Sequence, residues 1–298
     1  MKHLYLIALF LWSLSVNGQV NAYMDDFRLS GHSDFETEQE LLAQSESLLP
    51  QLLPYLQDSL SQVRQKAYYL IYRKGLQLPS AARDPFVMTL LQGCNDADGS
   101  VVGQNIIWLQ GFDKSDFSPP AHDLLETLIR KPRLPHRQRL LMLAGYVEAG
   151  KELMNRYLLQ SDLVARDRWY MNLALARMGN SNSVAFCLQT FEQMTLSNEF
   201  VEYAVPEMIY TRHKTIVDLC VTYLNSNEPL CSSADPDNEG AMLCGYRILE
   251  LVAPVIKDFP LRVSALGTLV TNDYEAALSA ARIWFERHPD YVVNNERF

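Results

Sequence analysis

Apolar residues recur along most of the chain at the three- and four-residue spacing that is typical of amphipathic helices. The clearest example lies at residues 162–179, where one face of the predicted helix is apolar: Val164, Trp169, Met171, Leu173, Leu175, Ala176 and Met178. The charged side chains of this segment are predicted to face solvent: Arg166, Asp167, Arg168 and Arg177. Gly179 is predicted to end the helix, because glycine readily adopts the left-handed conformation that follows a helix.

The helical segments are arranged in pairs. Each of four amphipathic segments follows another apolar segment of similar size after a short turn. The first members of the pairs are residues 40–57, 83–94, 120–131 and 151–160, and the second members are residues 58–75, 96–112, 139–150 and 162–179. The unit of helix, turn and helix recurs about every 30 to 40 residues, a spacing that indicates stacked helical repeats.

Polar residues recur in the same frame. Asp58 stands six positions before Arg64, and Asp162 stands six positions before Arg168. A glycine follows each of these arginines by eleven positions. The units at residues 96–112 and 139–150 lack one or both members of the pair.

At these residues the chain resembles HEAT-like repeat proteins, in the short form found in bacteria. The resemblance covers residues 36–180 and implies an all-α fold, a right-handed α–α superhelix of antiparallel helix pairs. It also implies a structural role for the two polar pairs. Their side chains are expected to bond along the stack and tie one repeat to the next: Asp58 with Arg64, and Asp162 with Arg168.

Residues 181–298 are expected to continue the helical pattern in a less regular form. Further helices are predicted near residues 182–195, 199–212, 214–224, 239–256 and 273–288, with an acidic loop at 225–240. Pro206 should end or kink its helix, because proline lacks a backbone N–H donor. No segment alternates as a strand does, which argues against a sheet. The last helix resembles part of a tetratricopeptide repeat and is expected to cap the stack.

The first residues have the layout of a secretory signal peptide. Lys2 and His3 form a basic start, an apolar run follows, and small residues lead to Ala22. We predict that residues 1–22 are cleaved and that residues 23–35 form an extended segment. A membrane anchor is the less favoured alternative, because the apolar run is shorter than the roughly 20 residues of a spanning helix. The chain is therefore predicted to be exported, to the bacterial periplasm or outside the cell, without stable membrane insertion.

Charge narrows the range of partners. The chain has 35 acidic residues against 26 lysines and arginines, a net charge of −9, and loss of Lys2 with the signal would make this about −10. Nucleic acid and anionic lipid are therefore poor candidates for partners, since no basic cluster is present.

The chain has five cysteines, a number too small for a disulfide scaffold. Cys94 and Cys187 lie among apolar helical residues and are expected to be buried thiols. An oxidising compartment would permit a disulfide from Cys231 to Cys220 or to Cys244, and the connectivity cannot be read from the spacing alone.

The sequence lacks motifs for catalysis or cofactor binding. It has no phosphate-binding Gly-Lys loop, no dinucleotide glycine fingerprint and no His-Glu-x-x-His zinc motif, and Phe35 replaces the second glycine of a nucleophile elbow in GHSDF. Acidic clusters at 96–99 and 235–240 resemble calcium loops, but Tyr246 stands where the second would need its closing glutamate. Several large aromatic residues are predicted to pack in the core, with a binding groove as the alternative: Trp108, Trp169, Trp284, Tyr68 and Tyr69.

The repeat pattern favours binding over catalysis. We predict a scaffold without catalytic activity that holds another protein or a peptide on its curved surface, with no cofactor and no metal. Two alternatives remain open. One is an enzyme with a site in the irregular C-terminal half, and the other is a purely structural component of the cell envelope.

Overall fold

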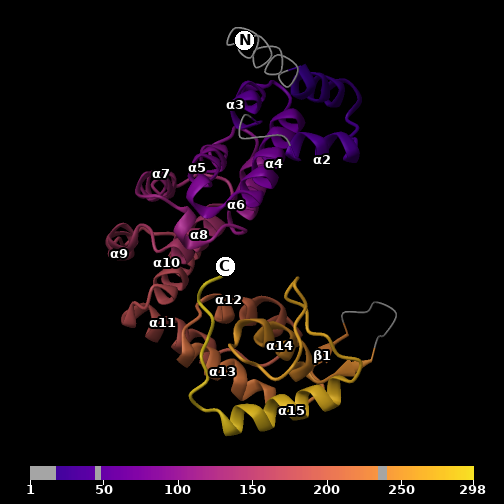
Figure 1. The fold of residues 1–298 in the computed structure, drawn as a ribbon. Helices are drawn as coiled ribbons and strands as arrows, with labels where there is room; N and C mark the ends of the chain where they lie inside the picture. The colour runs from indigo at the N-terminus through magenta and orange to yellow at the C-terminus, as the bar shows by residue number, and fades with distance from the viewer. Residues whose placement is uncertain (1–17, 44–47, 234–239) are drawn as a thin grey trace. The chain divides into compact units, whose positions relative to one another are not determined.

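The computed structural model describes residues 18–43, 48–233 and 240–298. Within them the protein is all-α apart from one short hairpin and isolated β-bridges (Figure 1), which confirms the all-α part of the predicted fold class. The chain divides into two compact units, Met1–Leu143 and Ala144–Phe298, called the N-terminal and C-terminal units below. In the ranges described, no helix has both the length and the apolar character needed to cross a bilayer.

The N-terminal unit is a succession of short helices after a helical stretch at residues 18–30. In chain order these are α2 (Phe35–Ala43), α3 (Leu48–Leu52), the 3-10 helix η1 (Leu53–Gln57), α4 (Ser61–Gln77), η2 (Ser80–Ala82), α5 (Asp84–Gly93), α6 (Gly99–Leu109), η3 (Lys114–Asp116), α7 (Pro119–Ile129) and α8 (Arg137–Val147), which continues into the next unit. The core between α4, α5 and α6 is formed by buried apolar side chains: Ala67, Leu70, Ile71, Leu90, Leu91, Val102 and Ile106.

Local sequence explains where these helices begin. The Ser118 hydroxyl accepts a hydrogen bond from the backbone N–H of Ala121, and Pro119 occupies the first turn of α7, where its missing N–H costs nothing. Asp98 caps α6 in the same way, because its carboxylate accepts from the backbone N–H of Ser100 at 2.8 Å. The turns that the sequence marked with Asp and Pro are therefore helix starts.

The segment expected to be extended at residues 23–35 is instead helical over residues 23–30. Val20 and Met24 are completely buried, at the four-residue spacing of one helix face. The predicted extended conformation is therefore wrong over residues 23–30. Residues 1–17, which make up most of the predicted signal peptide, lie outside the described residues.

The C-terminal unit is also built from short helices. After α8 it contains α9 (Lys151–Leu158), α10 (Ala165–Arg177), α11 (Ser181–Glu192), the π-helical turn η4 (Phe200–Ala204), α12 (Val205–Tyr210), α13 (Lys214–Leu224), strands β1 (Cys231–Ser232) and β2 (Ala241–Met242), α14 (Cys244–Val252), the 3-10 turn η5 (Ala253–Val255) and α15 (Tyr274–Arg287). Pro206 lies in the first turn of α12, directly after the π-helical turn, so the predicted break is a change of helix type.

The structure has helices at the positions predicted for the four pairs. They are η1 and α4, α5 and α6, α7 and α8, and α9 and α10. The predicted first member, residues 40–57, is not one helix: its described residues belong to α2, α3 and η1, and residues 44–47 lie outside the described residues. The later predicted helices are present as α11, η4 with α12, α13 and α15, whereas the helix expected from residue 239 begins only at Cys244. It starts late because residues 241–242 pair with residues 231–232 as an antiparallel hairpin.

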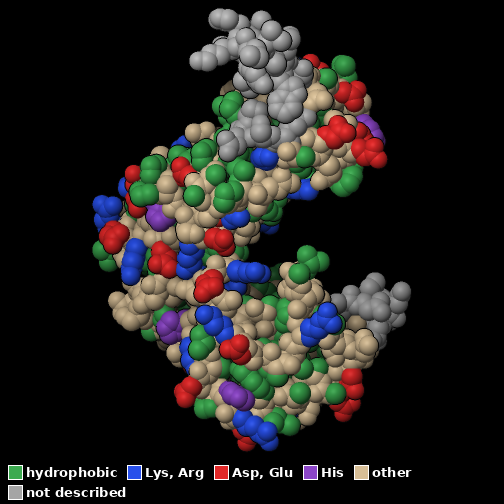
Figure 2. Space-filling model, in the orientation of Figure 1, with side chains coloured by type: hydrophobic (Ala, Val, Ile, Leu, Met, Phe, Trp, Pro, Cys, Tyr) green, Lys and Arg blue, Asp and Glu red, His purple; other side chains and the backbone are tan. Residues whose placement is uncertain are grey.

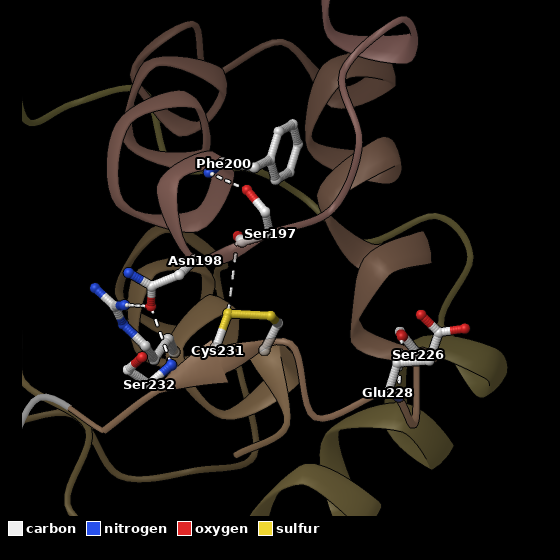
Figure 3. The surroundings of a disulfide bond; sticks show 9 residues. Ser197, Asn198, Phe200, Ser226, Glu228, Cys231 and Ser232 are labelled. Atoms are coloured by element: carbon white, nitrogen blue, oxygen red, sulfur yellow. Dashed lines mark hydrogen bonds between the residues drawn. A yellow bond between two sulfur atoms is a disulfide. The ribbon is translucent and has the colours of Figure 1, made fainter. Parts of the chain in front are cut away.

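A disulfide joins Cys231 to Cys244 across the base of this hairpin (Figure 3), which decides between the two pairings left open by the sequence. Cys220 is a free, buried thiol, as are Cys94 and Cys187. The hairpin is held to the preceding helices at Asn198, whose Oδ1 accepts from the backbone N–H of Ser232 at 3.0 Å. The acidic residues 234–239 between the strands lie outside the described residues.

Three side chains of the segment at residues 162–179 differ from the prediction in their exposure. Val164 precedes the first residue of α10 and is 65% exposed, whereas Arg177 in the last turn is only 5% exposed. Asp167, expected to face solvent, is also buried. Arg177 is covered because aromatic rings from distant parts of the unit surround it, as described below.

Candidate functional site

A groove of about 550 Å³ in the N-terminal unit is the best candidate for a binding site. It is lined by side chains from α4, from α6 and from the helical N-terminal stretch with the loop after it: Phe27, Ser33, Gln62, Gln65, Lys66, Tyr69, Gln104 and Trp108. Two hollows in the C-terminal unit are smaller, at about 410 and 400 Å³. Ligand sites are typically concave and combine apolar walls with a few polar groups, and this groove has both.

Lys66, which lines the groove, forms a buried ion pair with Glu38. The Lys66 ammonium bonds the Glu38 carboxylate, and both side chains are at most 10% exposed. The Tyr23 hydroxyl donates to the same carboxylate at 2.5 Å, and burial, followed by this bond to Glu38, raises the pKa of Tyr23 well above its usual value. Lys66 also lies 5.2 Å from the ring centre of Phe27 and 5.0 Å from that of Tyr69. Its charge is thus satisfied within the protein.

Aromatic rings form one wall of the groove. The Trp108 ring stacks on Tyr72 with 5.7 Å between ring centres and lies 6.0 Å from Tyr69. Arg73 donates to the Tyr69 hydroxyl at 2.5 Å, which fixes the orientation of that ring. Trp108 is 9% exposed, so it presents only an edge to the groove. The core interpretation therefore fits Tyr68, which is buried, while Tyr69 and Trp108 pack together and also line the groove.

Three glutamine amides supply the polar groups of the groove. Gln62, Gln65 and Gln104 form no side-chain hydrogen bond within the part of the chain that the structure describes. Each amide offers two N–H donors and one carbonyl acceptor. Sequence analysis missed them because a glutamine on a helix surface gives no distinguishing signal. It missed Phe27 and Ser33 because their segment was expected to be extended.

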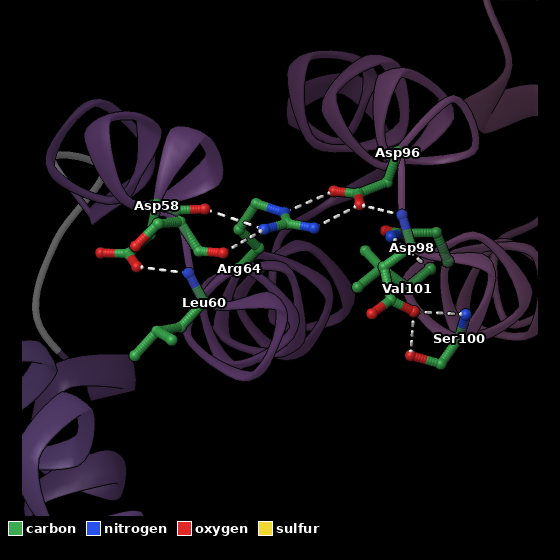
Figure 4. A network of polar contacts seen from close by, with 9 residues as sticks. Asp58, Leu60, Arg64, Asp96, Asp98, Ser100 and Val101 are labelled. Atoms are coloured by element: carbon green, nitrogen blue, oxygen red, sulfur yellow. Dashed lines mark hydrogen bonds and ion pairs between the residues drawn. The ribbon is translucent and has the colours of Figure 1, made fainter.

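Arg64 of the first predicted pair connects neighbouring helix pairs, but it bonds the carboxylate of Asp96 and not that of Asp58 (Figure 4). Arg64 donates to the backbone carbonyl of Asp58 at 2.8 Å, not to its carboxylate. Its Nε and Nη2 bond the two carboxylate oxygens of Asp96, in the turn before α6, at 2.7 and 2.6 Å. Asp58 instead accepts from the backbone N–H of Leu60 and pairs with Arg28 at 3.2 Å.

This contact fixes the position of both groove walls. Arg64 lies on α4 beside Gln65 and Lys66, and Asp96 precedes α6, which carries Gln104 and Trp108. A two-point bond between guanidinium and carboxylate restricts both distance and angle. Burial opposes ionisation of Asp96, but the bonds from Arg64 and from the Asp98 N–H outweigh it, so the pKa of Asp96 is lowered.

The second predicted pair, Asp162 with Arg168, is not joined. Arg168 donates to the backbone carbonyls of Leu158 and Gln160, both at 2.8 Å, and Asp162 is exposed. Arg137 at the start of α8 makes an equivalent contact, to the carbonyl of Ile129 at 3.0 and 3.1 Å. The recurring feature is an arginine at the start of the second helix that binds carbonyls at the end of the first. The aspartate is not required for it.

Other residues considered from the sequence have local roles. Asp96 is bound to Arg64 and Asp98 caps α6, so the first acidic cluster serves the turn. The second cluster, at 235–240, lies almost entirely outside the described residues. Among the described residues, no group of three metal-binding side chains is found. Trp169 donates to Glu207 at 2.8 Å, and Trp284 stacks on His288 at 4.6 Å.

Comparisons of the chain with protein-family models, with curated proteins and with solved structures find no match.

Proposed function

We propose that this chain is a non-catalytic binding protein that holds an extended peptide segment of a partner protein in the groove between α4 and α6. The observation that carries the proposal is the set of three glutamine amides, beside the Tyr69 and Trp108 rings, whose side chains have no hydrogen-bond partner among the residues that the structure describes. A peptide backbone presents alternating N–H and carbonyl groups, which these amides can pair with. The rings offer an apolar surface for one of its side chains.

Charge around the groove indicates a further property of the peptide. Acidic side chains gather near α2 on the face drawn in Figure 2, and the segment that supplies Phe27 and Ser33 also carries exposed Asp25, Asp26 and Asp34. Lys66 adds little positive potential, because Glu38 neutralises it. We therefore expect a peptide with an apolar residue next to a basic one.

Three features support the wider proposal of an exported helical-repeat scaffold. Helix pairs follow one another along the chain, Arg64 connects one pair to the next, and an aromatic and polar groove lies on the second helices. These are the properties expected of a HEAT-like solenoid, whose stacked pairs create a curved binding surface.

The Cys231–Cys244 disulfide supports export, because such bonds persist mainly in oxidising compartments. The groove residues include no histidine, cysteine or carboxylate that could activate Ser33.

The test is selection from a display library of random linear peptides on the purified chain, followed by affinity measurement of the enriched peptides. The double variant Gln65→Ala/Gln104→Ala should bind them roughly 5- to 100-fold more weakly, since each lost hydrogen bond contributes about 0.5–1.5 kcal/mol. The matched control is Gln77→Ala/Gln189→Ala, which removes two exposed glutamines outside the groove and should leave affinity unchanged. Absence of enriched peptides, or equal losses in both double variants, would contradict the proposal.

A further inference from the structure

Two inward-facing arginines of the C-terminal unit form a cluster apart from the groove. Arg177, in the last turn of α10, is 5% exposed, and its guanidinium lies 5.0 Å from the ring centre of Tyr146 and 4.8 Å from that of Tyr210. Arg212 follows α12 and donates to the carbonyl of Ile209 at 2.8 Å. Arginine side chains are seldom buried to this extent unless they bind a specific group.

The group that this cluster binds is the backbone of residues 296–298. The Tyr146 hydroxyl donates to the carbonyl of Glu296 at 3.1 Å, Arg177 donates to that of Arg297 at 2.5 Å, and Arg212 donates to that of Phe298 at 2.9 Å. Three consecutive carbonyls thus meet three donors from three different elements. Recognition through main-chain atoms is independent of the side chains at those positions.

Phe298 is the side chain of the segment that contacts the cluster, whereas Glu296 pairs with Lys257, outside the cluster, at 3.7 Å. The ring of Phe298 lies 5.6 Å from Tyr146 and 5.7 Å from Tyr210, and 5.7 Å from the Arg177 guanidinium. By contrast, residues 295–297 are exposed. The cluster therefore selects a non-helical backbone segment with an aromatic residue at one position, and it tolerates variation at the residues before it.

The segment does not satisfy the cluster completely. Within the residues described, the Nε atoms of both Arg177 and Arg212 are buried without a hydrogen-bond partner. Burial lowers the pKa of Arg177, and burial together with the nearby charge of Arg177 lowers the pKa of Arg212 to about 10. Buried donors without partners destabilise a structure, so a ligand with an additional acceptor would be held more tightly.

The contacts that hold residues 292–294 are separate from those of residues 296–298 with the arginine cluster. Residues 292–294 are fixed by a β-bridge between Ile256 and Val293 and by bonds of Lys257 N to Val292 O and of Asn294 N to Val255 O, at 2.9 and 2.7 Å. The contacts of residues 296–298 come after this bridge. Release of these residues would expose the two arginines and two tyrosines without breaking the bridge.

We propose that Tyr146, Arg177, Tyr210 and Arg212 form a second peptide-binding site. Residues 296–298 occupy it within the chain, and a non-helical, aromatic-containing segment of a partner protein occupies it in their place. This site is independent of the groove between α4 and α6, and its test does not rest on that proposal. A tethered segment competes at an effective concentration in the millimolar range. A free peptide should therefore bind weakly until the tethered one is loosened.

The probe is the labelled, amidated pentapeptide NNERF, which has the sequence of residues 294–298, titrated into the full-length chain and measured by fluorescence anisotropy. The Phe298→Ala chain should bind it at least 10-fold more tightly than the wild type. The pentapeptide NNERA should bind that chain at least 10-fold more weakly than NNERF does. The control Tyr203→Ala, at an exposed aromatic residue, should behave as the wild type.

Two further variants locate the binding. Addition of Arg212→Gln to Phe298→Ala should abolish the gain in affinity, and addition of Arg177→Gln should do the same. Circular dichroism melts establish that each chain is folded, and Arg212→Gln carries the test if the more buried Arg177 proves essential for folding. Equal peptide binding by the wild type and Phe298→Ala, or a gain that survives loss of Arg212, would overturn the proposal.

Discussion

The contact between Arg64 and Asp96 gives the sharpest prediction. Asp96→Asn keeps the shape of the side chain but removes its charge, leaving a guanidinium that is only 13% exposed without its carboxylate. Removal of one partner from a fully buried ion pair costs about 3–5 kcal/mol. Arg64 keeps its bond to the Asp58 carbonyl and some access to water, so we expect a smaller loss of unfolding free energy, about 2–3 kcal/mol.

The effect should depend on pH in a defined direction. The folded protein lowers the pKa of Asp96, so the stabilisation by its carboxylate is fully present above the unfolded value of about 3.9. It is lost as the pH falls through the lower folded pKa, where Asp96 becomes protonated. The difference in unfolding free energy between the wild type and Asp96→Asn should therefore be constant from pH 5 to 7 and should shrink below about pH 4.

The assay is urea denaturation of the full-length chain, together with hydrogen exchange of the amides of α4 and α6, since both helices are held by this contact. Asp162→Asn is the matched control, because Asp162 is exposed and Arg168 binds carbonyls instead of it. It should change the unfolding free energy by less than about 0.5 kcal/mol. A loss in Asp96→Asn no greater than that of the control, or a difference unchanged at pH 3, would refute the reasoning.

Further predictions concern the cysteines and one closely packed glycine. Cys231→Ser should lower the unfolding free energy of this unit by roughly 2–3 kcal/mol, because the bond to Cys244 closes a short loop, and denaturation with and without reductant measures this. Thiol labelling of the native protein should be slow until denaturant is added, since burial raises the pKa of every free thiol: Cys94, Cys187 and Cys220. Gly145→Ala should destabilise the protein by about 1–3 kcal/mol, because a Cβ there would lie 2.2 Å from the Tyr210 hydroxyl. Gly99→Ala, which meets nothing closer than 3.4 Å, is its control in thermal melts.

Much of the fold could be predicted because its information is local. The apolar spacing, the prolines in first turns and the Asp98 and Ser118 caps all act within a few residues, and they locate most of the helices. The pairing of Cys231 could be narrowed but not decided, because the choice depends on a hairpin between residues 231–232 and 241–242. Two-residue strands give no sequence pattern.

The candidate sites could not be predicted, because they depend on residues that are distant in sequence. Arg177 was expected to face solvent as a charged residue on a helix, and nothing near it indicates that Tyr146 and Phe298 would cover it. The groove brings Phe27 together with Trp108 in the same way. Its glutamines are ordinary surface residues until their neighbours are known.

The arginine that binds backbone carbonyls at the end of the preceding helix has a consequence for how the sequences of these helix pairs can diverge. Arg64, Arg137 and Arg168 each find their acceptor in the main chain, which every sequence provides. Substitution of the neighbouring acidic residue therefore leaves the hydrogen bonds between the two helices of a pair intact. In these three helix pairs, loss of the acidic residue should therefore be tolerated more readily than loss of the arginine.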